Sequence, residues 1–162
     1  MLGNEYVPDD LSLPQQNYIE VIAELIRDAG HARATDVAEL LGVSLPSVSE
    51  AVKRLAELGL VERKSRFEIS LSAGGRRIAQ QLQRRHQALK RFMTEVMAMN
   101  EEKADQVACR VEHCVDGEFA ERLRTLAEFL EREYPWTLKG IADHLRNGRR
   151  KEQSERSKGF QI

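Results

Sequence analysis

Three side chains with metal-binding donor atoms stand close together in the second half of the chain: Cys109, Glu112 and His113. In a helix, positions i, i+3 and i+4 share one face, so a thiolate, a carboxylate and an imidazole would converge there. That donor set can bind a divalent transition metal. The alternative is the polar margin of an amphipathic helix, which is the commoner role of such a trio.

Two other segments carry side chains that could complete such a site. His86 lies on the apolar side of a long helical pattern, between Leu82 and Leu89, where a structural histidine is the alternative. Asn17 and Glu20 stand at i and i+3 beside an apolar stripe, and each could instead be a surface residue. The six candidate ligands are Asn17, Glu20, His86, Cys109, Glu112 and His113. Their sulfur, nitrogen and oxygen donors suit Mn²⁺, Fe²⁺, Co²⁺, Ni²⁺ or Zn²⁺ better than Ca²⁺ or Mg²⁺.

The elements that would carry the first of these ligands begin near residue 15. Helical spacing of apolar residues predicts a helix from Gln15 to about Asp28, ended by Gly30. Thr35 is predicted to cap a short helix that Gly42 ends. The order of a long helix, a short helix and a glycine turn is typical of a helix-turn-helix.

A second short helix follows the turn. Ser44 is predicted to cap it, with Pro46 in its first turn and Gly59 at its end. Its predicted buried stripe consists of Val48, Ala51, Val52, Leu55 and Leu58. Beyond Gly59 the alternation around 60–61 and 67–71 predicts two short strands about a charged turn, which completes a winged helix-turn-helix.

The outward residues of this second helix and of the wing have the chemistry of a DNA-binding surface. Serine hydroxyls and N-terminal backbone N–H groups suit phosphate oxygens. Glu50 could accept a hydrogen bond from a cytosine amino group, or could simply be favoured by the helix dipole. Winged helices also serve as protein-interaction modules, which is the alternative for the whole surface. The predicted DNA-binding residues are Ser44, Pro46, Ser47, Ser49, Glu50, Lys53, Arg63, Lys64 and Arg66.

The remainder of the chain is predicted to be helical. A helix from Ser72 to Met99 is long enough to link two domains, and Asn100 is predicted to cap the next one. A last pair covers 118–134 and 137–145. The expected organisation is a flexible arm (1–13), a winged helix-turn-helix domain (14–75), a linker helix with a helical dimerisation and metal-binding domain (76–145) and a polar, disordered tail (146–162) that could touch DNA or remain solvated. The fold class is mainly α.

Composition excludes several classes of protein. The chain has 162 residues and a net charge of −1, which argues against a uniformly basic nucleic-acid binder. It shows no apolar run long enough to span a membrane and no secretory signal, so a cytoplasmic protein is expected. Two cysteines are too few for a disulfide scaffold, and their spacing is poor for a redox pair. Without a nucleophile elbow, phosphate loop or HExxH motif, an enzyme with a hydrolytic metal centre is the weaker interpretation.

The chain resembles the diphtheria toxin repressor and manganese transport regulator family of metal-dependent repressors over roughly residues 15–130. The resemblance is carried by NYIEVI, the block ARATDVAELLGVSLPSVSEAVKRLAELGLV, LSAGGRRIAQQLQRRH and ACRVEH. It implies a homodimer whose winged domains read a palindromic DNA operator and whose helical domains hold the metal and the dimer interface. At this length the chain is expected to lack the SH3-like third domain of the longer members.

The family's ligand positions fall on the six residues named above, as a hybrid of its branches. Glu20 is as in the manganese branch, Cys109 is as in the iron branch, and Asn17 matches neither. Lys90 stands where a carboxylate often helps to form a second site, and Asp105 stands where the iron branch has a histidine.

The resemblance implies a repressor of metal homeostasis that a divalent metal activates, Mn²⁺ or Fe²⁺ above all, with Co²⁺, Ni²⁺ or Zn²⁺ as substitutes. The alternatives are a metal-independent winged-helix regulator and a scaffold whose winged domain binds protein.

Overall fold

The computed structural model describes residues 11–65 and 68–145, and it is mainly helical with one small sheet. It divides into two compact units, an N-terminal unit (1–84) and a helical unit (85–162), and the boundary falls inside α4 (Ala73–Arg91). Among the described residues, no helix is long and apolar enough to cross a membrane. The predicted tail (146–162), residues 1–10 of the predicted arm and Arg66 lie outside the described residues.

The predicted first helix is confirmed as α1 (Leu13–Ala29). It begins at Ser12, whose backbone N–H donates to Gln15 Oε1 at 2.8 Å, and it ends where the N–H of Gly30 donates to the carbonyl of Ile26. Leu11 is buried, and its carbonyl accepts a hydrogen bond from Gln16 Nε2 at 2.9 Å. The predicted flexible arm is therefore wrong at its C-terminal end, because this contact holds the chain before α1.

The helix-turn-helix is formed by α2 (Ala34–Leu41) and α3 (Leu45–Glu57). The prediction that Thr35 caps α2 is wrong, because the N-cap is Arg33. Arg33 belongs to β1 (Ala32–Arg33), so the chain stays extended until the helix begins. Gly42 has a φ of 64° between the two helices, a conformation that glycine adopts without steric strain.

The wing is a three-stranded antiparallel sheet in the order β1-β3-β2. The predicted hairpin is confirmed as β2 (Val61–Arg63) and β3 (Glu68–Leu71), while β1 is an additional strand with Ala32 opposite Ile69. A strand of two residues has no alternation to detect, so the sequence pattern did not indicate it.

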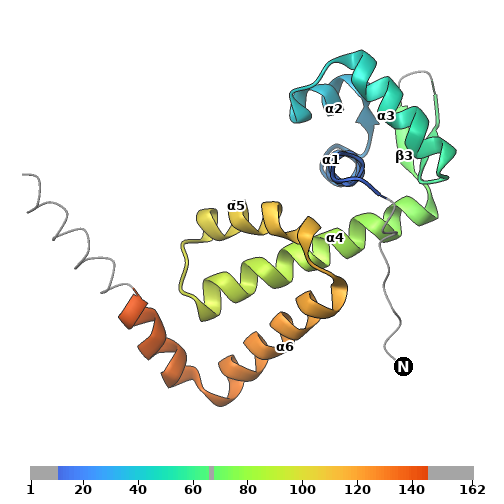
Figure 1. Cartoon of the computed structure of the whole chain (residues 1–162). Coiled ribbons are helices and arrows are strands. Elements are labelled where there is room, and N and C mark those ends of the chain that lie inside the picture. The colour runs from blue at the N-terminus through green and yellow to red at the C-terminus, as the bar shows by residue number, and fades with distance from the viewer. Residues whose placement is uncertain (1–10, 66–67, 146–162) are drawn as a thin grey trace, which may run out of the picture. The chain divides into compact units, whose positions relative to one another are not determined.

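The core of the N-terminal unit is one continuous cluster of buried side chains. The elements around it, among them α1, α2, α3 and β3, are grouped together in Figure 1. The largest fully buried side chains of this core are Ile19, Ile22, Val37, Val48, Val52, Leu55 and Leu82. The prediction that Leu58 is buried is wrong: it is 54% exposed, because α3 ends at Glu57 and Leu60 packs against the core instead. The start of α4 lies close to the chain after α3, since a Cβ on Gly75 would clash with the carbonyl oxygen of Leu60.

The helical unit continues from α4 through a π-helical turn, η1 (Phe92–Val96). The prediction of one α-helix as far as Met99 is therefore wrong at its end, where Met97 N–H bonds to Phe92 O and Ala98 has a φ of 49°. The unit then contains α5 (Glu101–Val111), a 3-10 turn η2 (Glu112–Cys114), α6 (Gly117–Glu133) and a helix at 135–145. The predicted cap at Asn100 is confirmed, because its side chain accepts from Lys103 N–H at 3.2 Å.

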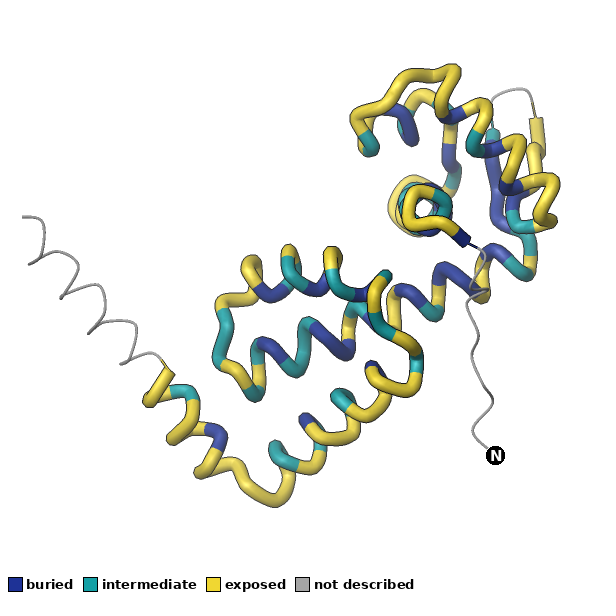
Figure 2. The backbone as a smooth tube through the Cα atoms, viewed as in Figure 1, coloured by how far each residue is buried: buried dark blue, intermediate teal, exposed yellow. Residues whose placement is uncertain are grey.

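The core of the helical unit is thin. Its cluster of buried apolar residues consists of Leu89, Met93, Ala104 and Ala108, and partly buried apolar residues pack against this cluster. Large apolar side chains instead lie at the surface of α6 and the helix at 135–145, where the tube in Figure 2 is mostly exposed. They are Phe119, Leu126, Phe129, Tyr134, Trp136, Ile141 and Leu145.

Candidate metal centre and DNA-binding surface

A buried carboxylate lies at the centre of the candidate metal site. Glu112 is 2% exposed, and its Oε2 lies 2.7 Å from Nδ1 of His86. Its Oε1 lies 3.6 Å from Nε2 of His113. The end of α4 positions His86, while η2 positions Glu112 and His113. The structure thus brings three of the six predicted ligands together within the helical unit.

The pKa values of the two imidazoles in this cluster are shifted in opposite directions. The hydrogen bond with Glu112 raises the pKa of His86, against the effect of burial, and Asp105 adds to the rise. Burial lowers the pKa of His113, although the neighbouring Glu112 opposes that shift. The surroundings therefore favour the charged form of His86, whereas they favour the neutral form of His113, which is the form that coordinates a metal.

These residues fit a divalent transition metal. A buried carboxylate needs a compensating positive charge, and two imidazole nitrogens close to it are typical ligands of such ions. A proton on His86 would supply part of that charge. A metal that takes its place would release the proton, as ligand deprotonation requires.

The remaining three predicted ligands are placed differently. Cys109 is exposed on α5. The expectation that Cys109, Glu112 and His113 share one α-helical face is wrong, because α5 ends at Val111 and tightens into η2. Asn17 and Glu20 lie on α1 in the N-terminal unit, both half-buried beside the buried stripe of that helix.

Charged residues outside the predicted ligand set surround His86. Asp105 Oδ1 lies 3.2 Å from His86 Nε2 and 3.0 Å from Lys90 Nζ. Lys90 Nζ also lies 3.3 Å from Glu101 Oε1. Sequence reasoning singled out Lys90 and Asp105 but did not pair them. The pattern that could have indicated this pairing is the i, i+4 spacing of 86 and 90 on one helix and of 101 and 105 on the next.

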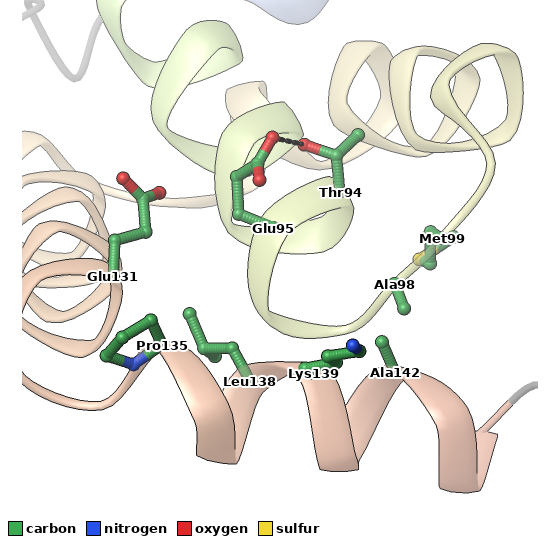
Figure 3. Close-up of a pocket in the computed structure, with 9 residues that line it drawn as sticks. All are labelled: Thr94, Glu95, Ala98, Met99, Glu131, Pro135, Leu138, Lys139 and Ala142. Atoms are coloured by element: carbon green, nitrogen blue, oxygen red, sulfur yellow. Dashed lines mark hydrogen bonds between the residues drawn. The ribbon is translucent and has the colours of Figure 1, made fainter.

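A separate cavity of about 420 Å³ lies elsewhere in the helical unit (Figure 3). Its lining comes from η1 and the turn after it, from the end of α6 and from the helix at 135–145. These residues are Thr94, Glu95, Ala98, Met99, Glu131, Pro135, Leu138, Lys139 and Ala142. None of the six candidate metal ligands lines it, so it is distinct from the cluster around Glu112.

The N-terminus of α3 is capped by Ser44, as predicted. The Oγ of Ser44 accepts from Ser47 N–H at 3.3 Å and lies 2.8 Å from Ser47 Oγ. The first-turn side chains are exposed, while Val48 turns into the core. The predicted residues on this helix that lie at the surface are Ser44, Pro46, Ser47, Ser49, Glu50 and Lys53.

Two charged groups on α3 already have partners. Glu50 accepts from Arg54 Nη2 at 2.6 Å, and Lys53 lies 4.0 Å from Glu57. Both pairs are exposed, so each is weak and can rearrange when another partner approaches. On the wing, Arg63 and Lys64 are exposed beside the turn.

Two domains of one known protein family match this chain. The N-terminal DNA-binding domain of iron-dependent repressors matches residues 10–66, and the metal-binding and dimerisation domain of the same repressors matches residues 72–137. The transcriptional regulator MntR of Escherichia coli O6:H1 is 38% identical over 112 residues, which cover 69% of this chain and 72% of that protein.

Solved structures agree with this match. IdeR of T. acidophilum superimposes with a TM-score of 0.63 at 25% identity, covering 75% of this chain and 55% of IdeR. The manganese regulator SloR superimposes with a TM-score of 0.61 at 28% identity, covering 71% of this chain and 54% of SloR. This chain thus spans about half the length of those two proteins. The two matched domains and the MntR relative show that this chain belongs to the diphtheria toxin repressor and manganese transport regulator family of metal-dependent, DNA-binding transcriptional repressors.

Proposed function

We propose that this protein is a homodimeric transcriptional repressor of metal-ion homeostasis, which a divalent transition metal activates for DNA binding. The observation that carries the proposal is the buried Glu112 carboxylate with an imidazole near each of its oxygens. This cluster lies within the domain that matches the metal-binding and dimerisation part of the family. The DNA-binding surface lies in the other matched domain.

The proposed ligand set contains residues of both units. His86, Glu112 and His113 form its centre, and Cys109 on α5 with Asn17 and Glu20 on α1 complete it. A bound metal would supply the positive charge that the buried Glu112 carboxylate needs. Because Asn17 and Glu20 lie on α1, which packs within the N-terminal unit, their coordination would hold the winged domain (14–75) to the helical domain (76–145).

That connection accounts for activation. Two recognition helices in a dimer must enter major grooves about 34–36 Å apart to bind a palindromic operator in the cytoplasm. Without metal, the dimer samples other spacings and binds DNA more weakly, so metal shifts the population towards the binding form. We propose that α3 reads the groove through Ser44, Pro46, Ser47, Ser49, Glu50 and Lys53, while Arg63, Lys64 and Arg66 reach the DNA backbone from the wing.

The metal is proposed to be Mn²⁺ or Fe²⁺, with Co²⁺, Ni²⁺ or Zn²⁺ as substitutes. The donor set includes a carboxylate and two imidazoles, which suit all of these ions. Related proteins are described as a manganese regulator, SloR, and as ScaR with bound Zn²⁺.

The test is metal-dependent selection of DNA. The purified dimer is mixed with fragmented genomic DNA, and binding is titrated separately with Mn²⁺, anaerobic Fe²⁺, Co²⁺ and Zn²⁺, and again with a chelator. We expect one or a few fragments to bind at least tenfold more tightly with metal, and the chelator to reverse the effect. Glu112→Gln and Cys109→Ala should lose this response, whereas Cys114→Ala, an exposed cysteine outside the ligand set, should keep it.

Two outcomes would overturn the proposal. Equal binding with and without metal, by wild type and Glu112→Gln alike, would identify a metal-independent winged-helix regulator. Selection of no DNA fragment under any condition would instead favour a winged domain that binds protein. A response retained by Cys109→Ala alone would remove Cys109 from the ligand set and leave the rest of the proposal standing.

A further inference from the structure

Five side chains form a row of alternating charge beside the proposed metal site. Starting from the surface, Glu101 contacts Lys90, Lys90 contacts Asp105, Asp105 contacts His86, and His86 contacts Glu112. The four distances are 3.3, 3.0, 3.2 and 2.7 Å in that order. All five residues belong to the helical unit, so the row is a feature of one compact body.

The row arises from two helices that face each other. His86 and Lys90 are one turn apart on α4, and Glu101 and Asp105 are one turn apart on α5. Each basic group therefore meets an acidic group on the opposite helix. The carboxylates hold Lys90 strongly enough to raise its pKa, and Lys90 in turn lowers the pKa of Asp105.

This arrangement sets the orientation of the His86 ring. Its Nε2 faces Asp105, and its Nδ1 faces Glu112. A metal-ligating histidine commonly donates its second ring N–H to a carboxylate, which fixes both ring orientation and tautomer. Asp105 can fill this role only while it remains a carboxylate at this position, and Lys90 holds it there.

The same arrangement determines how many cations the cluster can take. Glu101, Asp105 and Glu112, together with His86, would offer enough oxygen and nitrogen donors for two divalent ions. The Lys90 ammonium already lies between two of those carboxylates, and it would repel a second ion brought within a few ångströms.

We propose that Lys90 is a built-in cation that holds Asp105 against His86 and excludes a second metal, so that each protomer binds one metal ion. This inference rests on the proposed metal-binding function. It makes Lys90 and Asp105 positioning residues for the ligand His86, and it assigns the ammonium a role that a mobile cation would otherwise fill.

Metal stoichiometry tests the inference without reference to DNA binding. The full-length protein is titrated with Mn²⁺ by calorimetry, and bound metal per protomer is counted by elemental analysis after gel filtration. Electron paramagnetic resonance then distinguishes isolated Mn²⁺ from coupled pairs. Wild type should bind one ion per protomer with the spectrum of isolated Mn²⁺, whereas Lys90→Glu should bind two and show coupling.

Two further variants complete the experiment. Lys103→Glu makes the same charge change at an exposed site on α5 and should still bind one ion per protomer. Asp105→Asn should also bind one ion, but about 10–100-fold more weakly, as expected when the partner of a ligating histidine is lost. Asp105→Glu should recover part of that affinity.

The possible outcomes distinguish a failure of this inference from a failure of the proposed function. Two ions bound by wild type, or one ion bound by Lys90→Glu, would overturn the inference and leave the proposed function intact. No Mn²⁺ or other divalent ion bound by wild type would overturn the proposed function itself. If Lys90→Glu fails to fold, Lys90→Met removes the ammonium without adding charge, and the wild-type stoichiometry still decides.

Discussion

The two units of this protein bury different kinds of side chain. In the N-terminal unit, buried Ile, Leu and Val side chains form a continuous core, and the polar residues proposed to contact DNA lie outside it. In the helical unit, the packed cluster contains two alanines, a leucine and a methionine, while Glu112 is buried and large apolar residues are exposed on α6.

The difference bears on how each unit is stabilised. The N-terminal unit buries a continuous core of large aliphatic side chains within one chain. The helical unit has a smaller buried cluster and buries a carboxylate beside two histidines, so we expect a bound metal and a second copy to stabilise it. Its match to a metal-binding and dimerisation domain agrees with this interpretation. The predictions below test the contrast, starting from the largest effect.

The largest effect is expected in the core of the N-terminal unit. Leu55→Ala removes a fully buried side chain and should lower the free energy of unfolding by about 2–5 kcal/mol. Leu58→Ala, one turn later on the same segment but 54% exposed, should change it by less than about 0.5 kcal/mol. Chemical denaturation of both variants measures the difference. Equal costs at the two positions would contradict the proposed end of the core.

The next effect is stabilisation of the helical unit by metal. At a free Mn²⁺ concentration 100 times its Kd, the folded protein should gain about 2.7 kcal/mol, seen as a rise in Tm that a chelator reverses. Glu112→Gln should abolish the gain. Glu118→Gln, an exposed glutamate on α6, serves as the matched control and should keep it. A gain that survives Glu112→Gln would place the metal elsewhere.

A smaller effect is expected for dimerisation through α6. Leu126→Glu places a charge on the exposed apolar stripe of α6 (Phe119, Leu126 and Phe129) and should weaken the dimer by about 2 kcal/mol, or roughly 30-fold in Kd. Leu40→Glu makes the same change at a 56% exposed leucine of α2 and should have no effect on dimerisation. Sedimentation velocity without DNA compares the two. An unchanged dimer in Leu126→Glu would move the interface off this stripe.

The smallest effect concerns the two histidines of the metal-free cluster. Nuclear magnetic resonance titration should place the pKa of His86 above 6.5 and that of His113 below it. Because its pKa is raised in the folded state, His86 stabilises the fold below pH 6.5, and this contribution is lost as the pH rises through the folded value. Asp105→Asn should lower the pKa of His86 only slightly, because Glu112 is the larger cause. Identical pKa values for the two histidines would contradict the described cluster.

Family membership confirms the function class that the sequence predicted, a metal-dependent DNA-binding regulator rather than an enzyme. The sequence patterns that led to this prediction each involve only neighbouring residues. Apolar spacing along α1 and α3, the Ser44 cap and the glycine at position 42 specify a helix-turn-helix because each acts within a few residues. The candidate ligands His86, Glu112 and His113 could be identified for the same reason, since their residue types alone carry the chemistry.

The wrong predictions concern features that depend on contacts between segments far apart in the sequence. Thr35 does not cap α2 because β3 pairs with the residues before it, and the π turn of η1 forms where α5 and α6 pack against it. The pairing of Lys90 with Asp105 likewise needs α4 and α5 side by side. Sequence by itself determined where most helices lie, the caps at Ser44 and Asn100 and the available donor atoms, because those depend on neighbouring residues. Only the tertiary structure decided that His86 and Glu112, 26 residues apart, share a hydrogen bond in a buried site.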